Sequence, residues 1–547
     1  MFVARNMFTR YTPYALSILG SVATVILAVF NPWWWILAAV FLGLAALGTY
    51  DVFDRRRTIS RNYPIVAHLR YVFESFGPEI RQYFIQRDTE EVPFSREQRA
   101  IVYQRAKKAL DQRPFGTLLN VYEEGYEWMS HSMQPNDDLD PDFRVTIGSR
   151  RKQPYSASVL NISAMSFGSL SDNAIRALNR GAERGGFYHD TGEGSISRYH
   201  TESKGDLVWE IGSGYFGCRT SDGNFDAEGF RKNAALEQVK MIEVKLSQGA
   251  KPGRGGILPA AKVTLEIAEA RGVTQGQDVI SPARHSAFNT PIELMHFLAK
   301  LRELSGGKPV GIKLAIGHAW EWFALVKAML ETGETPDFIV VDGAEGGTGA
   351  APLEFVNRLG MPMAEALLLV HNTLVGTRLR EHIAIGAAGK ITSAFHMART
   401  LALGADWCNA ARGFMFAIGC IQAQSCHTDK CPSGVATQSK RRSHKLDVTD
   451  KSERVYNFHR HTLQALANLI GAAGLRHPAE LGPEHIMRRD AKDHINAYSE
   501  RYRFLKPGEL LDGPCNTTPF AEFWKDSCAA SFEPPQWVRE QRKSKLH

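Results

Sequence analysis

The chain has 547 residues, of which 44% are hydrophobic and 22% charged, so it can form two or three packed domains and wholesale disorder is not expected. Its net charge of +7 is spread along the chain without a recognition-helix or RNA-binding motif, which argues against a nucleic-acid-binding protein. Seven cysteines in so long a chain argue against a disulfide scaffold and favour a thiol-keeping compartment.

An uncharged apolar stretch dominates the N-terminal region. No charged residue occurs between Tyr11 and Tyr50, and this run exceeds the roughly 20 residues that cross a bilayer once. Asn31-Pro32 interrupts the run, where a turn between two helices is expected, and Trp33–Trp35 follow, a residue type favoured at membrane interfaces. Residues 1–53 are therefore predicted to form a transmembrane helical hairpin.

Basic residues flank this stretch on both sides: Arg5 and Arg10 before it, and Arg55, Arg56, Arg57 and Arg61 after it. By the positive-inside rule both ends lie in the cytoplasm, which predicts a multi-pass protein of the cell (inner) membrane with a cytoplasmic catalytic domain. The alternatives are a buried globular hairpin and a cleaved signal peptide, although a signal peptide has an apolar core of only about 7–15 residues.

Residues 54–150 are predicted to be a helical linking domain. Glu97–Leu110 has the spacing of apolar positions that is typical of a helix, and Pro114, Pro135 and Pro141 then interrupt the pattern. At the other end, residues 441–547 are predicted to be a helical extension, in which a helix at 454–473 packs against the preceding domain.

Short apolar runs alternate with amphipathic stretches in residues 151–440, which predicts parallel βα units. The region is long enough for one (β/α)8 barrel, and an open doubly wound sheet is the alternative, although no G-x-G-x-x-G follows an early strand. The predicted strands are Ser158–Ala164, Met241–Leu246, Val310–Ile316, Phe338–Val341, Ile383–Gly386 and Trp407–Ala410, and the predicted helices are Ile292–Leu304, Trp320–Leu330 and Ala394–Leu403.

Glycine-rich segments follow many of the predicted strands. In an eight-fold barrel this is the end that carries the active site, although each segment alone could be a tight βα turn. The segments are Ser166–Gly168, Gly192–Gly194, Gly249–Gly256, Gly343–Gly349, Gly386–Gly389 and Arg412-Gly413.

Three of the seven cysteines cluster near the end of the predicted barrel. Cys420, Cys426 and Cys431 lie within twelve positions, and Pro432 follows the last of them. This arrangement suits an iron–sulfur cluster in which each iron takes one thiolate, and a three-iron cluster needs three such ligands. Zinc with His427 as a fourth ligand is an alternative, but its ligands favour C-x2–4-C spacing. Inert buried thiols are a further alternative.

The segment Gly419–Gln438 (GCIQAQSCHTDKCPSGVATQ) resembles the cluster segment of the glutamate synthase large subunit. Four more segments resemble the same family in the same order: Ser163–Ser171 (SAMSFGSLS), Thr191–Gly194 (TGEG), Ser247–Gly256 (SQGAKPGRGG) and Asp342–Ala350 (DGAEGGTGA). The resemblance covers roughly residues 155–440. It implies an FMN-binding barrel, a [3Fe-4S] cluster on the three cysteines, and reductive synthesis of glutamate from 2-oxoglutarate and ammonia.

For FMN, the resemblance directs attention to the loops after strands seven and eight, which commonly bind phosphate in such barrels. Lys313, on the predicted fifth strand, could offset the negative charge that develops at flavin N1, although it could also be an ordinary strand-end lysine. The expected FMN-binding residues are Ser166, Gly168, Lys313, Gly346, Gly347, Gly386, Gly389, Lys390, Arg412 and Gly413.

For the substrate, the resemblance implies that Lys251 and Arg271 hold the carboxylates of 2-oxoglutarate. Glu193 matches a carboxylate beside it and is expected to handle a proton around 2-iminoglutarate. Two positions depart from the family pattern, because Arg254 and Ile257 stand where it has Glu and a substrate-contacting Gln. A different oxo acid or amine is therefore an open alternative. Ser195 also replaces the usual Gly after Gly194.

We expect no glutaminase domain, no β-helical domain and no NADPH-binding fingerprint in this chain. Ammonia is then expected from solution or a separate glutaminase subunit, and electrons from ferredoxin, a reductase or a membrane carrier. The competing hypotheses are a membrane-docked electron-transfer flavoprotein with a degenerate substrate site, and a structural anchor that keeps the barrel fold.

Overall fold

The computed structural model describes residues 2–54, 58–80, 84–85, 93–109 and 111–544. The chain forms two compact units, Met1–Arg96 and Glu97–His547. The basic flank Arg55–Arg57, which the sequence analysis used to orient the hairpin, lies outside the described residues. The orientation of the hairpin therefore stays a prediction.

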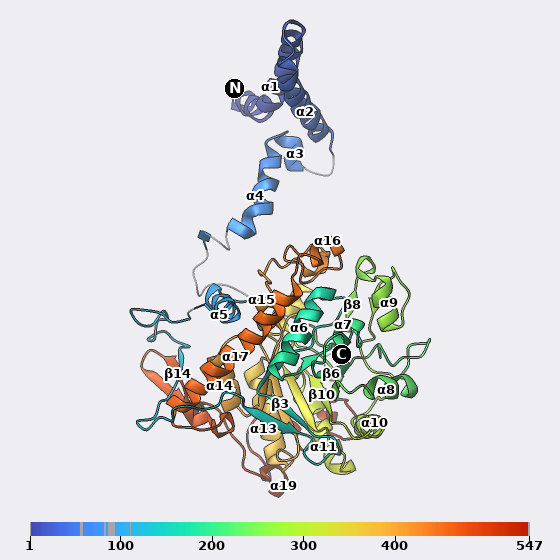
Figure 1. The fold of residues 1–547 in the computed structure, drawn as a ribbon, viewed down its shortest axis with the longest axis vertical. Helices are drawn as coiled ribbons and strands as arrows, with labels where there is room; N and C mark the ends of the chain where they lie inside the picture. Colours follow the sequence, from blue (N-terminus) through green and yellow to red (C-terminus); the bar gives the residue numbers. More distant parts are fainter. Residues whose placement is uncertain (1, 55–57, 81–83, 86–92, 110, 545–547) are drawn as a thin grey trace. The chain divides into compact units, whose positions relative to one another are not determined.

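Two long helices, α1 (Phe2–Phe30) and α2 (Trp34–Phe53), pack against each other in the first unit (Figure 1). The expected turn between them is observed, and the Asn31 side chain stabilises it by accepting a hydrogen bond from the Trp33 N–H at 3.1 Å. Both helices are long and apolar enough to cross a membrane, by length and composition. Most of their apolar side chains are exposed.

The helices of the hairpin approach each other closely. A Cβ on Gly20 would lie 2.6 Å from the Phe41 ring, so a larger residue there would force the helices apart. The hairpin is followed by α3 (Thr58–Asn62) and α4 (Ala67–Ile80).

Eight parallel strands close into a barrel in the second unit, which confirms the predicted (β/α)8 barrel and excludes the open sheet. The barrel strands, in chain order, are β4 (Leu160–Ile162), β5 (His189–Asp190), β6 (Leu207–Ile211), β7 (Val239–Lys245), β10 (Val310–Leu314), β11 (Phe338–Asp342), β12 (Ala384–Ala388) and β13 (Trp407–Ala410).

Helices connect the barrel strands and surround them (Figure 1). These helices are α6 (Asp172–Gly185), α7 (Arg198–Thr201), α8 (Ala227–Ala234), α9 (Leu265–Arg271), α10 (Pro291–Leu304), α11 (Ala319–Thr332), α12 (Leu353–Arg358), α13 (Met363–Gly376), α14 (Ala394–Ala402) and α15 (Arg412–Ala417). A small hairpin, β8 (Ile257–Leu258) with β9 (Val279–Ile280), lies in the long connection after β7.

Two barrel strands, β5 and β6, were missed by the sequence analysis. The first has only two residues, and the apolar run of the second, LVWEI, is interrupted by Glu210. A strand that turns an acidic side chain into the barrel does not look apolar in sequence, which is why the pattern failed there.

The segment before the barrel differs from the helical expectation. After α5 (Arg96–Ala106) it has turns and two strands, β1 (Glu127–Met129) and β2 (Arg144–Ile147). The prolines interrupt helical hydrogen bonding in this segment. Strand β2 pairs with β3 (Tyr155–Ser158).

The C-terminal extension packs on the barrel, as predicted, through α17 (Val448–Ala472), which contacts α6, α14 and α15. Strand β1 joins the hairpin β14 (Ile486–Ala491) and β15 (His494–Ala497) in a three-stranded antiparallel sheet. The remaining helices are α16 (Lys440–Ser443), α18 (Tyr498–Arg501), α19 (Glu509–Asp512), α20 (Phe520–Phe523) and α21 (Gln536–Ser544).

Candidate functional site

A cavity of about 120 Å³ lies at the carboxyl ends of the barrel strands. This is the end at which barrels of this type carry their active sites. Six residues singled out from the sequence line it: Ser166, Glu193, Lys313, Gly347, Arg412 and Cys426. The structure thus brings together residues from five predicted motifs.

Glu193 follows β5, and its carboxylate lies close to two glycines, where larger residues would collide with it. A Cβ on Gly256 would lie 1.9 Å from its Oε1 atom, and a Cβ on Gly212 would lie 3.0 Å from its Oε2 atom. Lys245 forms an ion pair with Glu193 at 2.8 Å. Burial acts to raise the pKa of Glu193, but Lys245 outweighs burial and holds the pKa below its usual value.

Lys251 and Arg271 are buried beside this cavity but do not line it. Arg271 Nη2 donates to the Phe167 carbonyl at 3.1 Å, and burial lowers its pKa to about 10. Burial also lowers the pKa of Lys251. Both cations interact electrostatically with Glu193, so the three residues share one electrostatic environment.

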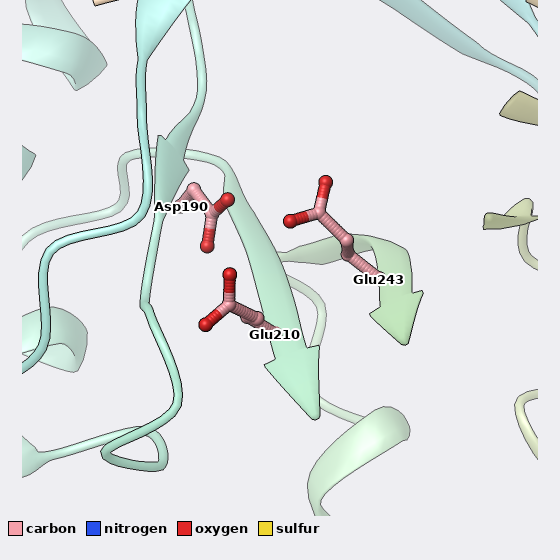
Figure 2. A group of neighbouring side chains, drawn as sticks. All are labelled: Asp190, Glu210 and Glu243. Carbon is pink, nitrogen blue, oxygen red and sulfur yellow. The ribbon is translucent and has the colours of Figure 1, made fainter. Parts of the chain in front are cut away.

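Lys313 lies on the fifth barrel strand, as expected, and is buried inside the barrel. Its Nζ atom lies 2.5 Å from Glu210 and 3.7 Å from Glu243. Asp190 completes a trio of carboxylates, and one oxygen atom from each lies within 4.8 Å of the other two (Figure 2).

The pKa values of these carboxylates move in opposite directions. Burial would raise the pKa of Glu210, but Lys313 and Lys245 lower it to about 2. Burial and the nearby Glu210 raise the pKa of Asp190 to about 7. Burial and Asp190 raise the pKa of Glu243 well above its usual value. One carboxylate therefore stays ionised while its two neighbours favour a proton.

The two loops expected to bind phosphate lie side by side, because β12 pairs with β13. Lys390 has a positive φ of 52° and follows β12, and Arg412 begins α15 and donates to the Thr348 carbonyl at 3.3 Å. Gly386 lies inside β12, where a Cβ would meet the Trp407 ring at 2.5 Å. Close packing against Trp407 therefore explains the glycine at this position.

The remaining glycines of the expected FMN set also lie near this end of the barrel. A Cβ on Gly347 would lie 2.7 Å from Arg412, and a Cβ on Gly389 would lie 2.8 Å from Met363. Gly168 has a φ of 104°, which favours glycine. Gly346 lies in the loop after β11, and Gly413 in the first turn of α15.

The three cysteines of the predicted cluster lie between α15 and α16, and their thiols interact electrostatically. Within the described part of the chain, the carboxylate trio inside the barrel is the group of three with ligand atoms within 4.8 Å, so the three Sγ atoms of the cysteines do not all lie within 4.8 Å of one another.

The loop after Cys431 favours a thiolate. Burial would raise the pKa of this thiol, but hydrogen bonds from Ser433 and from backbone N–H groups of residues 433, 435 and 436 lower it. Burial raises the pKa of Cys420 to about 11. Lys262 is buried nearby and donates to the Cys426 carbonyl at 3.2 Å.

Sequence reasoning missed Asp190, Glu210, Glu243 and Lys245. A usable signal was present in the predicted strand Met241–Leu246, where Glu243 and Lys245 are two positions apart among apolar residues. Since alternate residues of a strand face the same side, both point into the barrel.

Fold and site together define an α/β-barrel domain with a charged pocket at the carboxyl ends of its strands. The conserved region of glutamate synthases matches residues 110–476, more than half of the chain. The chain therefore belongs to the glutamate synthase family.

Two relatives extend this comparison. The glutamate synthase large subunit-like protein YerD of Bacillus subtilis is 37% identical over 480 residues, which cover 80% of this chain and 91% of YerD. An archaeal-type glutamate synthase (NADPH) of Thermotoga neapolitana is 33% identical over 313 residues, 57% of this chain and 58% of that protein. Among solved structures, a mutant flavocytochrome b2 with pyruvate bound has a TM-score of 0.43 and 12% identity, and covers 82% of this chain and 92% of that chain.

Proposed function

We propose that the chain is an FMN- and iron–sulfur-dependent oxidoreductase that reduces 2-iminoglutarate, formed from 2-oxoglutarate and ammonia, to L-glutamate. The observation that carries this proposal is the meeting of Glu193, Lys313, Arg412 and Cys426 around one cavity. Glu193 and Cys426 come from separate family-like motifs, whereas Lys313 lies on β10 and Arg412 begins α15. The fold gathers all four at the end where barrels carry catalysis.

The residues fit FMN by their chemistry. Lys390 and Arg412 would hold the phosphate on adjacent loops, and Lys313 would lie under the ring system. The cavity is smaller than the several hundred Å³ typical of cofactor sites, so its lining would have to open when FMN binds. When bound, FMN supplies a hydride.

The cations near Glu193 fit a dicarboxylate substrate. Lys251 and Arg271 would bind its carboxylates, and their pairing with charged oxygen atoms would offset the burial that lowers their pKa values. Reduction of a C=N bond requires a hydride on carbon and a proton on nitrogen. Glu193, which forms an ion pair with Lys245, would exchange that proton.

The cysteine segment fits a [3Fe-4S] cluster, with Cys420, Cys426 and Cys431 as ligands. Cys426 lines the cavity, so the cluster would lie next to the flavin and pass electrons to it one at a time. The external donor would be ferredoxin, a reductase or a membrane carrier, and ammonia would come from solution or a separate glutaminase subunit. The helical hairpin would anchor the enzyme in the cell (inner) membrane.

Anaerobic flavin reoxidation tests this function. The full chain is purified in detergent, reduced with dithionite, and mixed with 2-oxoglutarate and ammonium. We expect one glutamate per reduced flavin, with Glu193→Gln slowing the reaction. A preparation that lacks flavin and iron would refute the proposal.

A related synthase with another oxo acid is the second candidate. Ile257, at the position where the family has a substrate-contacting amide, is 49% exposed on β8 and does not line the cavity. Its side chain cannot replace the missing amide hydrogen bond. Faster reoxidation with a different oxo acid would favour this candidate, whereas reoxidation by an acceptor protein alone would favour an electron-transfer flavoprotein.

A further inference from the structure

A buried chain of charged groups connects Glu193 to Lys313 within the candidate site. Lys245 lies 2.8 Å from Glu193 and 3.5 Å from Glu210 Oε1, while Lys313 lies 2.5 Å from Glu210 Oε2. Glu210 therefore contacts both lysines, one with each carboxylate oxygen. The side chain of Glu210 is 2% exposed, so water screens these contacts little.

The carboxylates around Glu210 cannot all be ionised at low cost. Asp190 and Glu243 are 1% exposed, and their carboxylates point toward each other and toward Glu210 (Figure 2). Glu243 Oε1 has no hydrogen-bond partner and lies 3.7 Å from Lys313. Burial of uncompensated charge is strongly unfavourable, and such pairs usually hold a proton.

The other charged groups that face this pair come from neighbouring strands. They are Glu210 on β6 and Lys313 on β10. Asp342 on β11 interacts with Lys313 and accepts from the Gly249 N–H at 2.8 Å. Tyr188, directly before β5, also faces the pair, and its hydroxyl donates to Asn409 at 2.7 Å. Lys313 already pairs with Glu210, so it cannot fully neutralise Asp190 and Glu243 as well.

We propose that Glu210 is an ionised positioning residue that couples Lys313 to the Lys245–Glu193 pair, while Asp190 and Glu243 share one proton beside it. This inference deepens the proposed function, since it assumes that flavin lies over Lys313 and substrate near Glu193. The charge of Glu210 then sets both the field at the flavin and the orientation of the proton-exchanging carboxylate.

Glu210→Gln tests the coupling because it keeps the shape of the side chain and removes its charge. In the full chain with bound FMN, we expect a higher flavin midpoint potential, because a negative charge near the reduced flavin is lost. We also expect at least a tenfold lower turnover with little change in KM. Asp337→Asn is the matched control, because Asp337 is also buried and pairs with Arg151 and Arg302. An unchanged potential in Glu210→Gln, or an equal shift in the control, would overturn the coupling.

Infrared spectroscopy tests the shared proton without flavin or substrate. The wild-type chain should show the carbonyl stretch of a protonated carboxylic acid at neutral pH. This band should disappear in Asp190→Asn and in Glu243→Gln but persist in Glu210→Gln. Absence of the band from the wild-type chain would overturn the shared proton even if a variant failed to fold. Because the apo-protein suffices, this outcome is separable from failure of the proposed synthase activity.

Discussion

Proteins usually bury apolar side chains and expose charged ones. The hairpin and the barrel depart from this pattern in opposite ways. The hairpin exposes apolar side chains such as Leu19 and Val29, at 65% and 79%, whereas the barrel buries charged ones such as Glu210 and Lys313, at 2% and 5%. Each arrangement needs compensation: opposite charges provide it inside the barrel, and lipid would provide it around a membrane-spanning hairpin. Removing the compensation should therefore be more damaging than removing a surface contact.

The largest effect should come from breaking the charge pairing inside the barrel. Lys313→Met leaves Glu210 buried without its nearest cation, and we expect a loss of about 3–5 kcal/mol in the free energy of unfolding. Denaturant titration of the barrel unit measures this loss. Lys308→Met is the matched control, because Lys308 is also buried but donates to the carbonyls of Ala234 and Leu236. An equal loss in both variants would show that pairing with carboxylates is not the cause.

The hairpin should be the next most sensitive region if lipid surrounds it. Val22 is 57% exposed on α1, and Val22→Arg should cost about 2.5–3.5 kcal/mol of membrane insertion. The readout is the share of the chain that stays in washed membranes. Leu330→Arg, at a 37% exposed site on α11, should leave that share unchanged. Undiminished membrane retention of Val22→Arg would argue against a spanning hairpin.

A pH-dependent effect should come from the protonated pair. Because the pKa of Asp190 is raised from 3.8 to about 7, the folded state holds a proton that the unfolded state has lost. This stabilisation is complete below pH 3.8 and is lost as the pH rises through about 7, with a slope of about 1.4 kcal/mol per pH unit in that window. Asp190→Asn should remove this pH dependence of the free energy of unfolding. A wild-type profile that is already flat would contradict the prediction.

The smallest effect should come from an exposed ion pair. Lys440 is 65% exposed and lies 3.0 Å from Asp172, so Lys440→Ala should lower the free energy of unfolding by only about 0.2–1 kcal/mol. Thermal unfolding at low and high salt measures this effect, and the small difference from wild type should shrink in salt. If Lys440→Ala lowered the free energy of unfolding as much as Lys313→Met does, buried and surface charges would not differ in their contribution to stability.

Much of the fold could be predicted from local pattern. The turn at Asn31-Pro32, the strand carrying Lys313 and the helix α10 all follow from hydrophobic periodicity and turn residues. The motifs that resemble glutamate synthases also contribute residues to one cavity at the carboxyl ends of the barrel strands. Strands β5 and β6 were missed, since short or charged strands lack an apolar signature.

The sequence by itself determined where two helices could cross a membrane, where parallel strands alternate with helices, and which three thiols could share a cluster. These features depend on residues that are close together in the chain. Only the tertiary structure decided that Asp190, Glu210, Glu243 and Lys313 form one buried group, because each comes from a different strand. Strand periodicity indicates that a side chain faces inward, but barrel closure decides which charge it meets there.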